Sequence, residues 1–275
     1  MGKPVAIQGI KGSFHYQVAK EYFNSNQSVL ECMSFDSTVD SLINGTSDYS
    51  IIALENSIAG FIIPNYALID SNDLEISGEY YLDIQHHLMA LPDQSIKDII
   101  EVQSHPMALL QCKTFLKRFP HIKLVEAKDT AAIAKDIRDQ NLKGIAAIAS
   151  QRAAELFNLE ILGYSIQSIK HNETRFAIVK RKGNIGNART MDKASLKFVL
   201  GHKRGSLATM LNVMSDCKLN LTKIQSIPII DVPWKYAFFV DVTFDNTEDY
   251  LKAKSILMIM AEQFKVLGEY KNARL

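Results

Sequence analysis

Cysteines and long apolar runs are both scarce in this sequence, and each shortage excludes a class of protein. The 275 residues include 3 cysteines, and these lie far apart in the chain, at Cys32, Cys112 and Cys217. An odd number at such spacing favours neither a disulfide framework nor a zinc site, and it indicates a reducing, cytoplasmic compartment. No apolar stretch approaches the roughly 18 residues of a transmembrane helix, and the first residues lack the apolar core of a signal peptide. We therefore expect a cytoplasmic protein with no membrane partner.

The sequence also lacks an excess of positive or of negative charge. The formal net charge is +1, from 31 lysines and arginines against 30 aspartates and glutamates. This balance does not favour binding to nucleic acid or to an anionic membrane surface. Hydrophobic residues make up 47% and charged residues 22% of the chain, as in an ordinary globular protein. The length predicts about two domains, each able to bury a core of its own.

Residues with the spacing of a metal site or of a catalytic nucleophile are missing too. His86 and His87 are adjacent, so on a strand they would point to opposite faces. Neither they nor His105 belong to a cluster of histidine, cysteine and carboxylate residues with metal-ligand spacing. No nucleophile elbow and no signature of a nucleophilic cysteine is present. The sequence therefore predicts no metal site, and it gives no support for a covalent intermediate.

Short apolar runs alternate with amphipathic helical patterns from the start of the chain to residue 180. The run at 5–8 precedes a helical pattern at 13–23, and the continuous apolar run at 49–54 is typical of a strand covered on both faces. This alternation predicts an α/β fold with mostly parallel sheets. A polar, glycine-bearing linker is expected at 183–192, and the elements predicted beyond it follow the order βαββαβ of a ferredoxin-like domain.

Two polar segments near the N-terminus each allow a structural and a functional interpretation. The glycine-containing segment at 9–14 either binds an anion at a helix N-terminus or is a tight turn in which Ser13 caps the helix. Glu55, Asn56 and Ser57 follow a buried strand, at the position where ligands bind in open α/β sheets. The alternative is that Asn56 or Ser57 caps a helix.

Two later segments allow the same pair of interpretations. Ser104 begins a helical pattern that also contains Gln111, roughly 10 Å further along the helix axis. The two side chains either contact opposite ends of a small ligand or serve as a helix cap and a solvent-facing glutamine. At 171–179 the polar run His-Asn-Glu-Thr-Arg leads into the apolar run Phe-Ala-Ile-Val. That segment is either a turn-to-strand junction or a binding site at the edge of a sheet.

Taken in order, these segments resemble the motifs of the prephenate dehydratase family over nearly the whole chain. The matching segments are 9–19, 53–60, 104–112, 146–162 and 172–179, and the last contains the family's Asn-x-Thr-Arg-Phe signature. The C-terminal unit resembles an ACT regulatory domain through 205–211 and 219–229. The resemblance implies a two-lobed, periplasmic-binding-protein-like catalytic domain at 1–183 and an ACT domain at 194–275. Lobe one would comprise about 1–78 and 165–183, and lobe two about 79–164.

The family's reaction converts prephenate to phenylpyruvate, carbon dioxide and water in phenylalanine biosynthesis. It requires no cofactor or metal, but hydroxide is a poor leaving group and needs a hydrogen-bond donor. The resemblance implies that Thr174 is the catalytic threonine, and because threonine is a very weak acid we expect it to act as a positioned donor. The other residues implied by the resemblance are Glu55, Ser104 and Gln111 in catalysis, and Ser13, Asn56, Ser57, Asn172 and Arg175 in substrate binding. Arg175 either contacts a substrate carboxylate or braces its loop through an ion pair.

The resemblance also implies allosteric control in a homodimer or homotetramer, with phenylalanine as a feedback inhibitor bound where ACT domains pair. The implied effector-binding residues are Gly205, Ser206, Leu207, Asn220, Leu221 and Thr222. The chain departs from the family at 225–228, which reads Gln-Ser-Ile-Pro where many members read Glu-Ser-Arg-Pro. The alternative for this unit is a dimerisation domain that binds no ligand.

Two other functions are compatible with the same segments. Arogenate differs from prephenate by an amine in place of the side-chain keto oxygen, and no residue decides between an arogenate dehydratase and a prephenate dehydratase. A non-catalytic, amino-acid-sensing binding protein would keep the cleft and lose the chemistry. Such a sensor has no need for Thr174, which favours an enzyme.

Overall fold

The computed structural model describes residues 2–183, 191–201, 203–229 and 232–274. The chain forms two compact units, and it passes between them three times. The first unit comprises Met1–Asn65 and Tyr80–Phe176, and the second comprises Tyr66–Glu79 and Ala177–Leu275. Most of the linker expected at 183–192 lies outside the described residues. The domain bounds 1–183 and 194–275 do not coincide with this division, and they stay a prediction.

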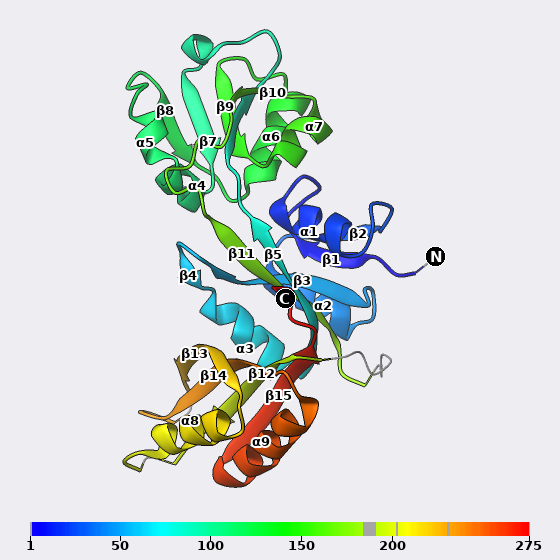
Figure 1. The fold of residues 1–275 in the computed structure, drawn as a ribbon. Coiled ribbons are helices and arrows are strands. Elements are labelled where there is room, and N and C mark those ends of the chain that lie inside the picture. Colours follow the sequence, from blue (N-terminus) through cyan, green and yellow to red (C-terminus); the bar gives the residue numbers. More distant parts are fainter. Residues whose placement is uncertain (1, 184–190, 202, 230–231, 275) are drawn as a thin grey trace. The chain divides into compact units, whose positions relative to one another are not determined.

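The first sheet has the strand order β2-β1-β3-β11-β5, with β4 paired to β3 (Figure 1). β1 is parallel to both β2 and β3, as the alternating pattern predicts, while β4 is antiparallel to β3. The strands are β1 (Val5–Gln8), β2 (Val29–Cys32), β3 (Tyr49–Asn56), β4 (Gly60–Phe61), β5 (Leu74–Asp83) and β11 (Glu173–Arg181).

Helices α1 (Phe14–Tyr22) and α2 (Phe35–Ile43) contact β1 and β3, so the apolar runs of both strands are buried. Each helix begins at a serine. The Ser13 side chain accepts a hydrogen bond from the backbone of Tyr16, and Ser34 forms a capping box with Ser37. Helix α3 (Ile63–Ser71) follows β4.

The second sheet has the order β10-β6-β9-β7-β8. β7 pairs in parallel with β8 and β9, because helices join these three strands. β6 is entered directly from β5 and is antiparallel to both β9 and β10, so this sheet is mixed where the sequence predicted mostly parallel strands. The strands are β6 (His87–Ala90), β7 (Glu101–Ser104), β8 (Lys123–Glu126), β9 (Ile145–Ala149) and β10 (Glu160–Gly163).

Two hydrophobic clusters cover the faces of this second sheet. One contains Leu109 and Leu116 from α4 (Pro106–Gln111) and α5 (Lys113–Leu116). The other contains Ile137 from α6 (Thr130–Asp139) and Ala153 from α7 (Gln151–Phe157). A short 3-10 helix, η1 (Ile96–Asp98), precedes β7. With helices packed on both faces, the strand termini are left to form the walls of a site.

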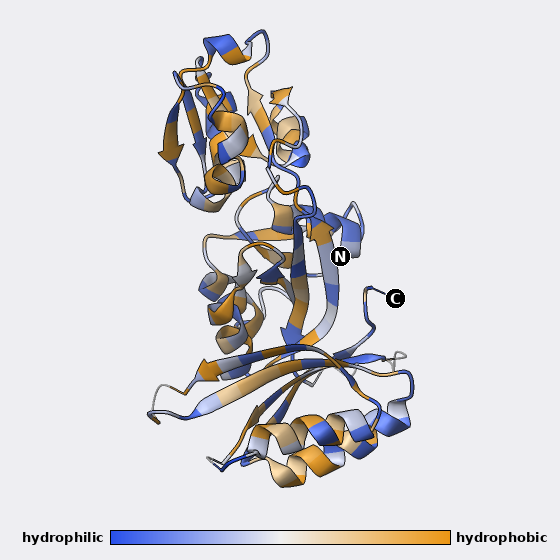
Figure 2. Cartoon of the chain, turned by 60° about the vertical axis from the view of Figure 1, so that its left-hand side comes forward, coloured by the Kyte–Doolittle hydropathy of each residue, from blue (hydrophilic) through white to orange (hydrophobic). Residues whose placement is uncertain are grey.

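The second unit contains a four-stranded antiparallel sheet of order β13-β14-β12-β15. Its element order is β12 (Lys193–Val199), α8 (Ser206–Asp216), β13 (Asn220–Pro228), β14 (Tyr236–Thr243), α9 (Thr247–Met260) and β15 (Gln263–Tyr270). This confirms the predicted βαββαβ arrangement. Both helices lie on one face of the sheet (Figure 2), where Met210, Met214, Tyr250 and Leu257 share a core with the strands.

Within the described ranges, no helix combines the length and apolar character needed to cross a membrane. The same ranges contain no group of three or more histidine, cysteine or acidic residues arranged to hold a metal ion.

Candidate active site

A cavity of about 350 Å³ lies in the first unit and is lined by residues of both sheets and their helices. From the first sheet and its helix come Ser13, His15, Asn56 and Thr174, together with Asn172 just before β11. From the second come His86, His105, Gln111, Lys128 and Asp129. Five residues that the family resemblance implied, from four separate motifs, therefore share one cavity: Ser13, Asn56, Gln111, Asn172 and Thr174.

The glycine-containing turn at 9–14 places the first sheet against the second. The backbone oxygen of Gly12 accepts a hydrogen bond of 2.7 Å from the Ser150 hydroxyl. Gly9 has a φ of +89°, and a Cβ atom there would lie 2.7 Å from a carboxylate oxygen of Asp129. The turn needs glycine at this position because of both the left-handed backbone and the close approach.

Asn56, at the end of β3, connects three segments of the cavity wall. Its side-chain oxygen accepts from the backbone N–H groups of Ile58 at 3.0 Å and Ala59 at 2.8 Å. Its amide nitrogen donates to the side-chain oxygen of Asn172 at 2.7 Å and to the hydroxyl oxygen of Thr174 at 2.9 Å. Thr174 is held at the start of β11 by a residue more than a hundred positions away in the sequence.

A second pair of contacts links the same network to the other sheet. The amide nitrogen of Asn172 donates to the side-chain oxygen of Gln111, the last residue of α4, at 3.0 Å. Nε2 of His86 lies 2.9 Å from that same oxygen. The Gln111 carbonyl oxygen thus contacts two side chains, while its amide nitrogen is left for the cavity.

Two histidines in the cavity wall are neutral. Burial lowers the pKa of His15 from 6.5 to about 4, and burial likewise lowers the pKa of His86 to about 4. Nε2 of His15 and Nδ1 of His86 are buried and have no hydrogen-bond partner in the part of the chain that the structure describes. The His15 ring packs edge-on against Phe176 with 5.0 Å between centroids, and Phe14 packs edge-on against His86 at 5.7 Å. These aromatic contacts make this part of the wall weakly polar and uncharged.

Asp129 is the acidic residue among the described cavity-lining residues. It caps helix α6, and one carboxylate oxygen accepts from the backbone of Ala132 at 2.8 Å. Burial raises the pKa of this carboxyl above its usual range, against the opposing effect of the backbone hydrogen bonds. The cavity therefore holds one carboxyl group whose charge is costly to keep.

Four residues expected at the site do not line the cavity in this structure: Glu55, Ser57, Ser104 and Arg175. The Ser104 side chain is fully buried, and its hydroxyl donates to the backbone oxygen of Ile148 at 2.7 Å. The Ser57 hydroxyl accepts from the backbone of Glu173 at 2.9 Å, which joins the ends of β3 and β11. Arg175 is buried, with only 4% of its surface exposed. Their roles in catalysis or binding stay predictions.

The lining residues that were not predicted from the sequence include His15, His86 and Asp129. In the sequence, His86 suggests only a metal ligand, and His15 lies inside the motif at 9–19 without a signal of its own. Asp129 follows β8, so the rule that ligands bind beyond the carboxyl ends of strands was sufficient to find it. For the two histidines no comparable pattern exists, since a single histidine beside apolar residues is most often part of a core.

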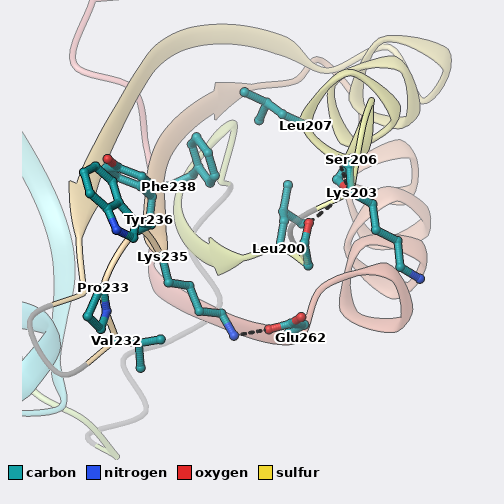
Figure 3. A pocket seen from close by; sticks show the side chains of 12 residues that line it. Leu200, Lys203, Ser206, Leu207, Val232, Pro233, Lys235, Tyr236, Phe238 and Glu262 are labelled. Carbon is teal, nitrogen blue, oxygen red and sulfur yellow. Dashed lines mark hydrogen bonds and ion pairs between the residues drawn. The ribbon is translucent and has the colours of Figure 1, made fainter.

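A second cavity, of about 680 Å³, lies at one end of the four-stranded sheet in the second unit. Figure 3 shows Leu200, Leu207 and Phe238 around it, with Lys203 and with an ion pair between Lys235 and Glu262. Ser206 and Leu207, two of the expected effector-binding residues, line this cavity. Gly205, Asn220, Leu221 and Thr222 are not among its lining residues, and their role in binding an effector stays a prediction.

The sequence of the chain matches one family of known proteins. Residues 5–184 match the family model of prephenate dehydratase. The chain is 31% identical to the bifunctional chorismate mutase/prephenate dehydratase of Enterobacter agglomerans, over 97% of this chain and 70% of that protein. It is 32% identical to the chloroplastic arogenate dehydratase/prephenate dehydratase 2 of Arabidopsis thaliana, over 97% of this chain and 72% of that protein.

Two solved structures have the same fold. GqqA, a quorum quenching acylase of a novel type, superposes with a TM-score of 0.88 at 26% identity, covering 98% of each chain. The prephenate dehydratase of Arthrobacter aurescens in complex with L-Phe superposes with a TM-score of 0.86 at 23% identity, covering 98% of this chain and 90% of that one. These two likenesses show the fold. The family match over more than half of the chain, together with relatives that are 31% and 32% identical, shows that the chain belongs to the prephenate dehydratase family.

Proposed function

We propose that the protein is a prephenate dehydratase that converts prephenate to phenylpyruvate, carbon dioxide and water. In this step the bond from the ring to its carboxylate breaks, and its electron pair enters the ring. The ring hydroxyl leaves with one proton as water, and no net oxidation occurs. The observation that supports this chemistry most directly is the position of Thr174, which lines the cavity with its oxygen accepting from Asn56. The threonine hydrogen then has no acceptor among the described residues and is available to the leaving hydroxyl.

The polarity of the cavity is consistent with the loss of the ring carboxylate. That charge disappears in the transition state, so strong binding of it in the ground state would slow the reaction. Phe14, Phe35 and the neutral His15 form one part of the wall that carries no positive charge, which suits a ring that becomes aromatic, whereas Lys128 is a cation among the other lining residues. Gln111 offers N–H donors on another part of the wall, which suits the oxygen atoms that persist through the reaction.

The test is formation of phenylpyruvate from prephenate by the purified chain. We expect turnover without added metal or cofactor, and a loss of turnover in Thr174→Val that does not change the circular dichroism spectrum. The absence of product from folded wild-type protein would exclude this function.

Arogenate is the second candidate substrate. The Arabidopsis relative carries both activities in its name. The specific feature that favours it here is Asp129, a carboxyl group in the cavity wall that suits the ammonium group of arogenate. Initial rates on the two substrates distinguish the candidates, and Asp129→Asn should lower the rate on arogenate more than the rate on prephenate.

We also propose that residues 194–275 form an ACT regulatory domain that binds phenylalanine. The second cavity supports this proposal because it combines an apolar wall, from Leu200, Leu207 and Phe238, with both charge signs, from Lys203 and Glu262. An aromatic amino acid presents the same combination. The related structure from Arthrobacter aurescens was obtained in complex with L-Phe. Residues 1–183 would then be the catalytic domain, in a cytoplasmic homodimer or homotetramer.

Calorimetric titration with L-phenylalanine tests the effector proposal directly. We expect saturable binding, inhibition of turnover, and loss of both in Leu207→Glu, which places a carboxylate in the apolar wall. If phenylalanine neither binds the wild-type protein nor changes its rate of prephenate turnover, the unit is a dimerisation domain without this ligand.

A further inference from the structure

The hydrogen bonds around Asn56 have a fixed direction. Backbone N–H groups can only donate, so the Asn56 atom that contacts Ile58 and Ala59 must be its oxygen. The other end of the Asn56 amide is then NH₂, and its contacts in Asn172 and Thr174 must be acceptors. No rotation of the Asn56 amide satisfies both sets of contacts in another way.

The donor and acceptor roles at Asn56 also determine those of the residues that it joins to the second sheet. Because the Asn172 oxygen accepts from Asn56, its NH₂ group faces Gln111, and the atom of Gln111 that it contacts must be the carbonyl oxygen. His86 Nε2 also contacts this oxygen, at 2.9 Å, and must therefore carry a hydrogen. With one ring proton in a neutral imidazole, the buried Nδ1 of His86 is a lone pair without a partner among the described residues. The network determines one tautomer of this histidine.

These hydrogen bonds determine which group of the Gln111 side chain is available to a ligand in the cavity. Its carbonyl oxygen accepts two hydrogen bonds, from Asn172 and from His86, which uses both of its lone pairs. Its NH₂ group makes no hydrogen bond to a described residue, and Gln111 lines the cavity. An oxygen acceptor of the substrate, such as a carboxylate, is the partner that this group requires. A buried polar atom without a partner, like Nδ1 of His86, is uncommon unless the site has a reason to keep it.

We propose that His86 is a positioning residue: its imidazole, held in the Nε2–H tautomer, locks the Gln111 carboxamide with its NH₂ group directed at an anionic oxygen of the substrate. This inference rests on the proposed dehydratase function. His86 itself does not take part in proton transfer to the leaving hydroxyl. It acts on binding through Gln111, and the same contact persists from the bound substrate to the transition state.

Substitutions of His86 distinguish the contribution of its N–H donor from that of the imidazole ring itself. His86→Leu removes the N–H donor and frees Gln111 to rotate, so KM for prephenate should rise roughly 10- to 100-fold, the effect of a hydrogen bond to a charged group. Turnover at saturation should change little, because the lost contact is equal in ground and transition states. His86→Gln places an amide N–H near the former Nε2 and should recover most of the affinity.

The matched control is His87→Gln. His87 is as buried as its neighbour, but it does not line the cavity and its ring accepts from the backbone of Ser165. Its substitution should leave KM unchanged. A double-mutant cycle shows the route of the effect: in a Gln111→Leu background, His86→Leu should raise KM no further. Additive effects of the two substitutions would overturn the proposal.

The tautomer can be observed without any activity. In nitrogen-15 NMR spectra of histidine-labelled protein, the His86 signals are assigned from the difference between wild type and His86→Gln, among 7 histidines in all. We expect a protonated Nε2 and an unprotonated Nδ1. The opposite tautomer in folded protein would overturn the inference, even in an active enzyme. The expected tautomer in a protein that does not convert prephenate would instead contradict the proposed function and leave the arrangement of Gln111 in place.

Discussion

The amide nitrogen of Asn56 lies 2.9 Å from the hydroxyl oxygen of Thr174, and it donates to that oxygen. This contact joins the end of β3 to the start of β11 across 118 positions of sequence. Thr174 is 7% exposed and lies in the cavity wall, so its hydroxyl is held in place on the oxygen side and is left with one hydrogen to donate. A weak acid becomes useful when its position and direction are fixed in advance.

Replacing Thr174 tests this role of the hydroxyl. Thr174→Val keeps the shape of the side chain and removes the donor, so the turnover number for prephenate should fall by about 10² to 10⁴. Thr174→Ser keeps the hydroxyl and should stay within about tenfold of wild type, because the bond from Asn56 can still form. Initial-rate kinetics give both numbers, and thermal unfolding checks that the fold is intact. Turnover by Thr174→Val close to wild type would remove Thr174 from the mechanism.

Local periodicity was sufficient to predict the elements of this fold but not how they converge. Burial of an element follows from the spacing of its own apolar residues, so the α/β pattern and the βαββαβ order were visible in the sequence. Strand direction depends on connections, which is why the antiparallel position of β6 was not predicted. The meeting of Asn56 and Thr174 depends on long-range pairing of strands, and only the resemblance to a family indicated it.

The two buried histidines show the same limit at the level of chemistry. His15 and His86 have no motif of their own, and their neutral state results from desolvation in the folded protein. Ser104 shows the converse case. The family resemblance implied a role for it in catalysis, while in the folded protein its hydroxyl donates to the backbone oxygen of Ile148, a contact that no local pattern in the sequence indicates.

Burial of His15 predicts that the protein loses stability as the medium becomes acidic. Its pKa is about 4 in the folded protein, against 6.5 for a histidine side chain exposed to water. Between these values the unfolded chain binds a proton that the folded protein does not, so the free energy of unfolding falls as pH decreases from 6.5 towards 4. At pH 5 this loss is about 2 kcal/mol for one such histidine.

His15→Phe isolates that contribution. The substitution keeps an aromatic ring against Phe35 and Phe176 and removes the titrating group. Urea unfolding gives the free energy of unfolding of each protein at pH 7 and at pH 5. The decrease from pH 7 to pH 5 should be about 2 kcal/mol smaller in the variant than in wild type, because His86 and all other titrating groups are present in both proteins. Equal decreases in the two proteins would show that His15 is not buried in its neutral form.

The ion pair between Lys193 and Glu79 predicts a stability effect in the second unit. The lysine nitrogen lies 2.9 Å from both carboxylate oxygens, and the two side chains are 5% and 0% exposed. Glu79→Leu removes the carboxylate that this buried lysine contacts and should cost about 3–5 kcal/mol. The double variant Glu79→Leu, Lys193→Met removes both charges and should recover most of that loss. Urea unfolding measures both, and equal losses in the single and double variants would contradict the prediction.

Gly268 in β15 predicts a steric effect in the same unit. A Cβ atom at this position would lie 2.2 Å from the backbone oxygen of Ile76 in β5, far inside any normal contact. Gly268→Ala must push the two strands apart and should lower the free energy of unfolding by roughly 2–4 kcal/mol. Gly201→Ala is the matched control, because its Cβ would meet only the flexible end of the Glu262 side chain, at 3.1 Å. Thermal and urea unfolding of the two variants should differ clearly, and similar stabilities would show that β15 and β5 do not approach so closely at Gly268.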